Sequence, residues 1–297
     1  MNVLITGATG FVGMNLKEYL GFTHNVKSIS IRYNESQKIK INDKVVIHLA
    51  GKAHDLKKIS NPQDYYEANF ELTKQLFDAF LASEATVFIF MSTVKAVADE
   101  VKGVLTEDSI PNPKTHYGIA KHQAEQYILS AVVPEGKRVC ILRPCMIHGP
   151  GNKGNLNLLY QLVAKGLPWP LGAFENQRSF LSIENLCFVI KELLENDSIS
   201  SGVYQVSDDE SLSTNELIQL VGMSLNKNAR ILNLSQKVIT SIAKLGDHLH
   251  LPLNTERLQK LTENYMVSNQ KIVKAMGKSL PVTAKEGLLK TFVSFRK

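Results

Sequence analysis

Short apolar runs alternate with longer stretches of helical periodicity through the first half of the chain. The apolar runs predict buried strands at Val3–Thr6, Val26–Ile31, Val45–Leu49, Val87–Met91 and Val139–Leu142. The helical patterns between them cover roughly Val12–Gly21, Tyr65–Ala82 and Tyr117–Val132. Because strands that alternate with helices form parallel sheets covered on both faces, the pattern predicts an α/β fold with a doubly wound, Rossmann-like parallel sheet.

The first apolar run leads into Gly7-Ala8-Thr9-Gly10-Phe11-Val12-Gly13, and a helical pattern follows at once. A strand, a glycine turn and a helix start make a phosphate-binding loop. The glycines let the backbone turn tightly and approach a pyrophosphate, whose charge lies at the helix N-terminus. The spacing is G-x-x-G-x-x-G instead of the commoner G-x-G-x-x-G. Its position at the start of a strand–helix unit still predicts dinucleotide binding.

The pattern is less regular in two places. Before Val45, only Ile39-Lys40-Ile41 could be the third strand of the first half, so that edge of the sheet is expected to be trimmed. Beyond Gly149-Pro150-Gly151 the periodicity gives way to loops and separate helices. We expect a dinucleotide-binding domain over residues 1–150. Residues 151–297 should form a smaller, mainly substrate-binding part, with some segments returning to the sheet.

Composition narrows the class of protein. The 297 residues suffice for a nucleotide-binding unit and a smaller part. Cys140, Cys145 and Cys187 have neither a metal-binding spacing nor a disulfide framework, which predicts no metal site and a reducing, cytoplasmic location. The start does not read as a signal peptide, and no apolar run could span a bilayer, so no membrane partner is expected. The net charge of +6 suits an anionic small ligand. It does not indicate nucleic acid, because the lysines are spread along the chain.

Tyr117 and Lys121 are four residues apart in a predicted helix, which places them on one face. A cation beside a phenol favours the phenolate, so we expect a lowered pKa for Tyr117. Such a tyrosine can exchange a proton with a sugar hydroxyl or carbonyl. The alternative is a solvated surface pair, which arises often by chance.

The chain resembles the extended short-chain dehydrogenase/reductase family of nucleotide-sugar epimerases and dehydratases over essentially its whole length. The matching segments are TGATGFVG at 6–13, VVIHLAG at 45–51, EANFELT at 67–73, FIFMST at 88–93, YGIAK at 117–121, LRPCMIHGPG at 142–151 and RSFLSIENL at 178–186. Within the family it is most similar to the bacterial surface-polysaccharide branch. The segments STVK at 92–95, GLPWPLG at 166–172 and TERL at 255–258 carry that similarity.

The resemblance implies a catalytic group of Thr93, Tyr117 and Lys121. Thr93 would bind the sugar oxygen at the reacting carbon, Tyr117 would be the acid/base, and Lys121 would lower its pKa and bind the nicotinamide ribose. The implied cofactor contacts are Gly7, Gly10, Phe11, Val12, Arg32, Leu49, Ala50, Gly51, Asn69, Tyr117, Lys121 and Pro144. The implied substrate contacts are Thr93, Asn155, Leu156 and Arg178. Of these, Arg178 would bind the diphosphate of a UDP-sugar.

The second strand offers a clue to the choice between NAD and NADP. NAD enzymes usually place a carboxylate near its end for the adenosine ribose. Here Ser30 stands near that place and Arg32 follows. Arginine can bind a phosphate with two hydrogen bonds, so NADP is slightly favoured over NAD. The alternative is a solvated loop arginine.

Departures from the family pattern narrow the reaction. Dehydratases of the family carry an Asp-Glu pair after the threonine, and Val94 and Lys95 stand there instead, so elimination of water is not expected. A 4-keto reductase or a 4-epimerase of a UDP-sugar remains, in bacterial surface-polysaccharide precursor synthesis. The alternative is a non-catalytic NAD(P)-binding sensor or scaffold. The family also implies a homodimer through the helices near Tyr65 and Tyr117. His148 replaces a family tyrosine and is expected to be structural more than to contact the sugar.

Overall fold

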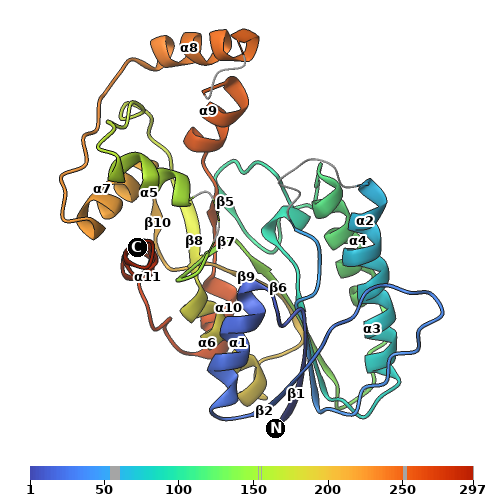
Figure 1. Cartoon of the computed structure of the whole chain (residues 1–297). Helices are drawn as coiled ribbons and strands as arrows, with labels where there is room; N and C mark the ends of the chain where they lie inside the picture. The colour runs from blue at the N-terminus through green and yellow to red at the C-terminus, as the bar shows by residue number, and fades with distance from the viewer. Residues whose placement is uncertain (54–60, 153, 155, 250–252, 297) are drawn as a thin grey trace.

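The computed structural model describes residues 1–53, 61–152, 154, 156–249 and 253–296. Six parallel strands form its central sheet in the order β2-β1-β3-β4-β6-β9 (Figure 1). These strands are β1 (Asn2–Thr6), β2 (Asn25–Ile29), β3 (Val45–His48), β4 (Val87–Met91), β6 (Arg138–Pro144) and β9 (Gly202–Val206). The predicted α/β fold with a parallel sheet is confirmed.

Helices cover both faces of this sheet because alternate side chains of each buried strand point to opposite faces. On one face Val3 and Ile5 pack with α1 (Phe11–Gly21), α6 (Ile183–Glu195) and α10 (Gln270–Met276). On the other face Leu4 and Val46 pack with α3 (Leu72–Leu81) and α4 (His116–Ser130). Strands buried on both faces are continuous apolar runs, which is why the sequence pattern predicts them.

Residues 39–41 and 62–81 depart from regular secondary structure. Ile39–Ile41 is irregular, and Ile41 is buried in the apolar core that includes α3. Just before this segment, Gln75 on α3 donates to the carbonyls of Asn34 and Gln37. The sheet edge at β2 is trimmed as expected. The helical pattern predicted over roughly 65–82 is confirmed, and a π-helical turn divides this continuous stretch into three segments. They are α2 (Pro62–Tyr66), a π-helical turn η1 (Glu67–Glu71) and α3.

A second apolar core lies in the C-terminal part. A small sheet of β7 (Met146–His148), β8 (Arg178–Ser182) and β10 (Ser211–Leu212) contributes to it. The helices around this core are α5 (Leu156–Ala164), α7 (Thr214–Ser224), α8 (Gln236–Leu249), α9 (Thr255–Thr262) and α11 (Ala284–Val293). The remaining elements are a 3-10 turn η2 (Val94–Ala96) and the paired short strands β5 (Val104–Leu105) and β11 (Met266–Val267). No helix of the described residues has the length and apolarity needed to cross a bilayer.

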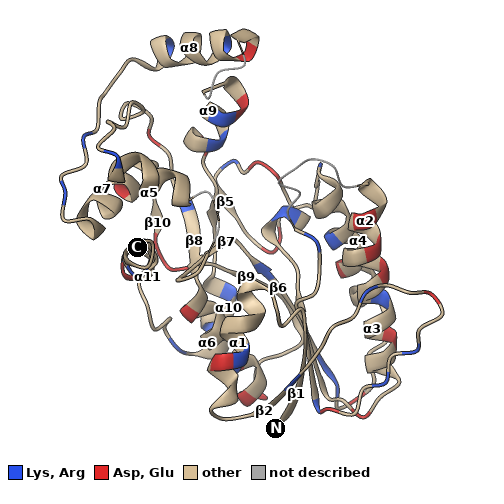
Figure 2. Ribbon diagram, viewed as in Figure 1, with Lys and Arg blue, Asp and Glu red and all other residues tan. Residues whose placement is uncertain are grey.

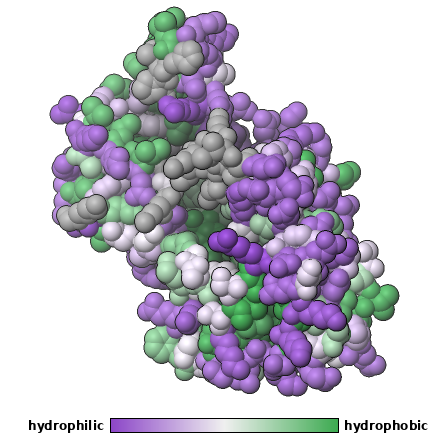
Figure 3. All heavy atoms as spheres, turned by 45° about the vertical axis from the view of Figure 1, so that its right-hand side comes forward, coloured by the Kyte–Doolittle hydropathy of each residue, from purple (hydrophilic) through white to green (hydrophobic). Residues whose placement is uncertain are grey.

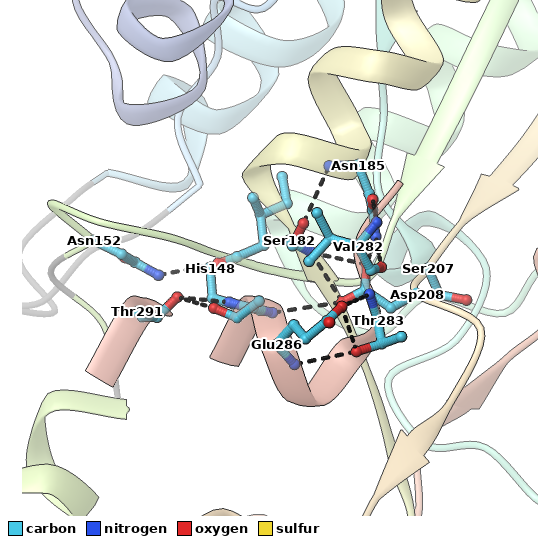
Figure 4. Close-up of polar contacts among 12 residues, drawn as sticks. His148, Asn152, Ser182, Asn185, Ser207, Asp208, Val282, Thr283, Glu286 and Thr291 are labelled. Atoms are coloured by element: carbon cyan, nitrogen blue, oxygen red, sulfur yellow. Dashed lines mark hydrogen bonds and ion pairs between the residues drawn. The ribbon is translucent and has the colours of Figure 1, made fainter. Parts of the chain in front are cut away.

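A buried polar network joins this part to the central sheet (Figure 4). His148 on β7 is fully buried, and its Nδ1 lies 2.9 Å from Thr291 Oγ1 on α11. Because Thr291 donates its own proton to the Gly287 carbonyl, it accepts one from His148. The other ring nitrogen faces Asp208 at 3.6 Å. His148 is therefore enclosed by protein groups, as its expected structural role requires.

Candidate active site

The glycine loop is fixed by close contacts between β1 and β3. Gly7 has a positive φ of 71°, and a Cβ there would lie 2.6 Å from the Ala50 nitrogen. A Cβ on Gly13 would lie 2.3 Å from the Gly7 carbonyl oxygen. Glycine at both positions lets α1 and the loop after β3 meet over the end of β1.

The N-terminus of α1 is open to an anion. Its N-cap is Gly10, which supplies no side-chain cap, and no acidic residue occupies the first turn. Within the described residues, the amides of Phe11 and Val12 have no hydrogen-bond acceptor. Uncapped amides and the helix dipole favour a phosphate at this place. These residues fit the pyrophosphate of a dinucleotide.

A directed chain of hydrogen bonds holds the loop after β3. The Ala50 amide donates to Thr6 Oγ1, which lies 2.7 Å from His48 Nδ1. His48 Nε2 lies 3.0 Å from Thr73 Oγ1, and Thr73 donates to the Asn69 carbonyl. Since Thr73 has given its proton away, His48 Nε2 is the protonated nitrogen and Nδ1 accepts from Thr6. Burial keeps this ring neutral by lowering the pKa of His48 to about 3.

Asn69 lies in the π-helical turn and is fully buried. Its Oδ1 accepts from the Lys52 amide at 3.1 Å, and its Nδ2 donates to the carbonyls of Lys52 and Tyr65. The amide therefore holds the loop that carries Gly51, which was not foreseen. Its direct contact with a cofactor stays a prediction.

Thr93 and Tyr117 are brought together by a close approach of η2 and α4. Thr93 caps η2 through the Lys95 amide, and Thr115 caps α4 through the Gly118 amide. A Cβ on Gly118 would lie 2.4 Å from the Lys95 carbonyl oxygen, so glycine is needed where the two elements touch. The approach gives a side-chain hydrogen bond between Thr93 and Tyr117. This places a hydroxyl pair at the carboxyl end of β4.

Lys121 lies one turn further along α4 and is 3% exposed. Its Nζ donates to the Met91 carbonyl at 2.8 Å and lies 4.6 Å from the Phe90 ring centre. A Cβ on Gly51 would lie 3.3 Å from this Nζ, so the ammonium borders the loop after β3. The predicted catalytic residues and the predicted cofactor loop thus meet at one end of the sheet.

The charge states differ from the sequence-based expectation. Burial raises the pKa of the Tyr117 phenol to about 12, although its hydrogen bond with Thr93 acts in the opposite direction. Burial also lowers the pKa of Lys121 to about 7, while the charge of Glu125 acts to raise it. The prediction that Lys121 lowers the pKa of Tyr117 was wrong for this structure. The ammonium is itself desolvated and hydrogen-bonds to the backbone.

Sequence reasoning missed a buried ionic group directly beneath. Glu125 is 1% exposed and Arg143 is 5% exposed. Arg143 donates from Nε and Nη2 to the Glu125 carboxylate, with its shortest contact at 2.6 Å, and Ser92 Oγ donates to the same group. Burial alone would raise the pKa of Glu125, but its hydrogen bonds and the charge of Arg143 outweigh burial and hold that pKa below its usual value. The available signal was Glu125 itself, four residues beyond Lys121 on the same helical face.

Two cationic side chains lie next to Tyr265, one from each part of the chain. Arg178, at the start of β8, donates to the Lys260 carbonyl and lies 3.7 Å from Glu263. Burial lowers the pKa of Arg178. Lys95 donates to the Asp99 carbonyl at 2.8 Å, with its Nζ 4.4 Å from the centre of the Tyr265 ring. The structure therefore leaves Arg178 partly desolvated and tied to the C-terminal end of α9.

The remaining predicted contacts are placed as follows. Leu49 directly follows β3 and packs against the first core, Pro144 is the last residue of β6, and Leu156 begins α5 inside the second core. Arg32 is exposed just beyond β2 and makes no hydrogen bond or ion pair with any described residue. Asn155 lies outside the described residues. Direct contact of these residues with a ligand stays a prediction.

Comparison with known proteins agrees with this geometry. The model of the "NAD dependent epimerase/dehydratase family" matches residues 3–207. A UDP-glucose 4-epimerase of Vibrio cholerae is 29% identical over 99% of this chain and 95% of its own length. An N-acetyl-alpha-D-glucosaminyl-diphospho-ditrans,octacis-undecaprenol 4-epimerase of Escherichia coli O157:H7 is 31% identical over 76% of this chain and 73% of its own length. The fold is similar to that of UDP-glucuronic acid 4-epimerase from Bacillus cereus in complex with NAD. That likeness has a TM-score of 0.75 and 21% identity, and covers 98% of this chain and 97% of the other.

Proposed function

The chain belongs to the NAD-dependent epimerase/dehydratase family, and on that premise we propose that it acts at carbon 4 of a UDP-sugar, as a 4-keto reductase or a 4-epimerase. Its setting would be the synthesis of bacterial surface-polysaccharide precursors. The observation that carries the proposal is the Thr93–Tyr117 hydroxyl pair at the end of β4, beside the loop that Lys121 borders. It is an NAD(P)-dependent enzyme of the short-chain dehydrogenase/reductase type, like its relatives.

The chain's own residues would hold the dinucleotide in the expected way. The uncapped start of α1 would bind the pyrophosphate, and the Ala50–Gly51 loop would pass alongside it. When bound, the nicotinamide supplies or accepts the hydride. Arg32 supports a slight preference for NADP, because an exposed guanidinium free of protein partners in the described residues can bind a 2′-phosphate.

Tyr117 would handle the proton. A phenol with a pKa of about 12 is protonated at neutral pH, and that form can donate from Oη to the oxygen of a carbon-4 ketone. Thr93, hydrogen-bonded to Tyr117, would hold the same oxygen. The buried Lys121, whose Nζ donates to the Met91 carbonyl and borders the loop after β3, would bind the nicotinamide ribose. In the reverse direction the phenolate would take the proton of the carbon-4 hydroxyl.

Elimination chemistry is not supported by the residues after Thr93. Val94 is buried and apolar, and the Lys95 ammonium donates to the Asp99 carbonyl beneath the Tyr265 ring. Neither residue supplies the carboxylic acid and carboxylate that water elimination requires. Hydride transfer at one carbon remains the chemistry that fits, either once in a reductase or out and back in an epimerase.

Two incubations test the proposal. UDP-N-acetylglucosamine alone should be converted to its carbon-4 epimer by an epimerase, without added cofactor. The 4-keto-6-deoxy derivative with NADPH should lose NADPH absorbance stoichiometrically if the enzyme is a reductase. Turnover of neither substrate, with a dinucleotide retained by the purified protein, would favour the non-catalytic sensor or scaffold. The homodimer and the cytoplasmic location stay predictions.

A second candidate keeps the chemistry and changes the group attached to the sugar. The Escherichia coli relative is named for a sugar on a diphospho-undecaprenol. Arg178 could bind a diphosphate in either substrate, and an exposed apolar stripe on α8, described below, favours a lipid-linked one. Incubation with N-acetylglucosamine linked to diphospho-undecaprenol in detergent, followed by sugar analysis, distinguishes the two.

A further inference from the structure

Helix α8 carries three different stripes of side chains along its length. One stripe is buried in the second core or against the chain that follows, and consists of Ile239, Ala243 and Gly246. The next is apolar yet exposed, and consists of Val238 (52%), Ile242 (43%), Leu245 (54%) and Leu249 (59%). The third is exposed and polar, with Lys237, Ser241, Lys244 and His248. At about 100° per residue, the exposed apolar stripe lies between the buried stripe and the basic one.

This arrangement is built into the fold. A Cβ on Gly246 would lie 1.9 Å from the Leu253 carbonyl oxygen, so glycine lets the chain fold back closely after α8. Asp247 accepts a hydrogen bond from the Thr255 amide at 3.0 Å at the start of α9. The other end of α9 contacts Arg178 through the Lys260 carbonyl. Helix α8 is thereby connected, through about 12 Å of α9, to Arg178, the residue predicted to bind the diphosphate.

The surface around α8 is basic as well as apolar. Between Leu225 and Leu249 the chain has four lysines and arginines and one acidic residue, Asp247, which bonds to Thr255. Neither Lys237 nor Lys244 pairs with a carboxylate of the described residues. Figure 1 shows α8 at one extreme end of the molecule, and Figure 2 marks both basic and acidic positions on α8 and α9 there. In the space-filling view apolar and hydrophilic side chains lie side by side at this end (Figure 3).

We propose that α8 docks this protein on the surface of a bilayer that contains anionic phospholipid. An exposed aliphatic stripe with lysines along one side is the pattern of a helix that lies in the headgroup region with its apolar face inserted shallowly. The lysines complement anionic headgroups. The stripe contains only Val, Ile and Leu, whereas protein interfaces are centred on Tyr, Trp and Arg. The membrane would then lie at the end of the molecule that α8 occupies, and α9 would connect that end to Arg178.

The proposal revises the expectation of no membrane partner, which considered only spanning segments. It is independent of which UDP-sugar reaction the enzyme performs. Its test is therefore run beside an assay of the soluble nucleotide sugar, so that loss of docking and loss of chemistry are separate results.

The test is co-sedimentation with vesicles, using the full chain. One set of vesicles contains phosphatidylcholine and phosphatidylglycerol in equal parts, and the other contains phosphatidylcholine alone. The apolar variant is Ile242→Glu with Leu245→Glu. The charge variant is Lys237→Gln with Lys244→Gln. The matched control is Phe22→Glu with Ile110→Glu, two apolar residues that are 84% and 89% exposed away from α8.

We expect the wild type and the control to bind the anionic vesicles. The charge variant should lose about 30-fold in partition coefficient, from about 1 kcal/mol for each lysine. The apolar variant should lose more than about tenfold, and all variants should keep turnover of the soluble substrate. Absence of wild-type binding, or equal binding by the apolar variant, would overturn the proposal. The proposal would also be overturned if a second copy of the chain covers the stripe. In that case light scattering would show a dimer, and Ile242→Glu with Leu245→Glu would convert it to a monomer without changing vesicle binding.

Discussion

Two groups of buried residues around α4 differ in whether burial leaves them charged. The group around Tyr117 and Lys121 is called the upper layer, and the group around Glu125 and Arg143 is called the lower layer. In the upper layer Lys121 is buried against a backbone carbonyl and an aromatic ring, and its pKa falls to about 7. In the lower layer, one turn further along α4, Glu125 is buried as deeply but receives the forked guanidinium of Arg143 and the hydroxyl of Ser92. Its pKa falls as well, and for a carboxyl this preserves the charge.

The difference shows that partners, and not depth, decide whether a buried group stays ionised. A desolvated ion keeps its charge when donors or counter-charges replace the lost water. The Glu125–Arg143 pair of the lower layer therefore keeps both of its charges. The upper layer, with Tyr117 protonated and Lys121 close to half-protonated at neutral pH, holds groups whose protons can move.

The largest effect should come from removing the mobile proton of the upper layer. Tyr117→Phe deletes only the hydroxyl, so kcat should fall by about 10²–10⁴-fold. The melting temperature should change little, because no buried charge loses its partner. Stopped assays of the nucleotide sugar and thermal unfolding of the same preparation measure the two quantities. A mutant with wild-type kcat would remove Tyr117 from the mechanism.

The lower layer should respond in stability. Arg143→Met leaves the Glu125 carboxylate buried without its counter-charge, which should cost about 3–5 kcal/mol of unfolding free energy. Adding Glu125→Gln removes the orphaned charge and should restore much of that loss. Urea unfolding of the single and double variants provides the measurement. If the double variant is no more stable than Arg143→Met, the unpaired charge of Glu125 is not what destabilises the single variant.

Lys121→Met should separate the layers by pH. The ordinary lysine pKa is about 10.4, so between about pH 7 and that value the unfolded chain binds a proton that the folded chain has released. Lys121 therefore lowers stability at and below pH 7, and this penalty disappears as pH rises through the window. The methionine variant should be more stable by on the order of a few kcal/mol at pH 7, with the gain lost near pH 10. A gain that is the same at every pH would contradict the lowered pKa, as would no gain at all.

The smallest change is Ser92→Ala. It removes one of several donors to Glu125 and leaves Arg143 in place, so the expected loss is about 1 kcal/mol. Chemical denaturation of this variant beside Thr86→Ala, which removes an exposed hydroxyl just before β4, gives a matched control. A loss as large as that of Arg143→Met would mean that Ser92, and not the guanidinium, sets the state of the carboxylate.

The sequence predicted the elements of this site better than its electrostatics. Buried parallel strands and the glycine loop are encoded in short stretches of sequence, so local patterns predict them. The partner of Glu125 lies 18 residues away on β6, and no spacing rule connects a helix to a neighbouring strand. The pKa of Tyr117 was expected to fall because the sequence showed a nearby cation and did not show how strongly the site is desolvated.

The same limit applies to two other segments, residues 39–41 and α8. Ile39–Ile41 has the composition of a strand, but it packs in the core beside α3 without joining the sheet. The stripes of α8 are indistinguishable in sequence, because Ile239 and Ile242 are equally apolar. Only packing shows that the first is buried and the second is exposed.

The central claim is that a proton moves at Tyr117 while hydrogen is exchanged at carbon 4 of the sugar. The direct test is to locate deuterium in the product by NMR. The enzyme receives either UDP-N-acetylglucosamine labelled at carbon 4, or the 4-keto-6-deoxy sugar with NADPH labelled at its transferable position. In whichever reaction turns over, we predict deuterium on carbon 4 of the product, at a rate that collapses in Tyr117→Phe. Label at another carbon, label lost to water, or an undiminished rate in Tyr117→Phe would contradict the account.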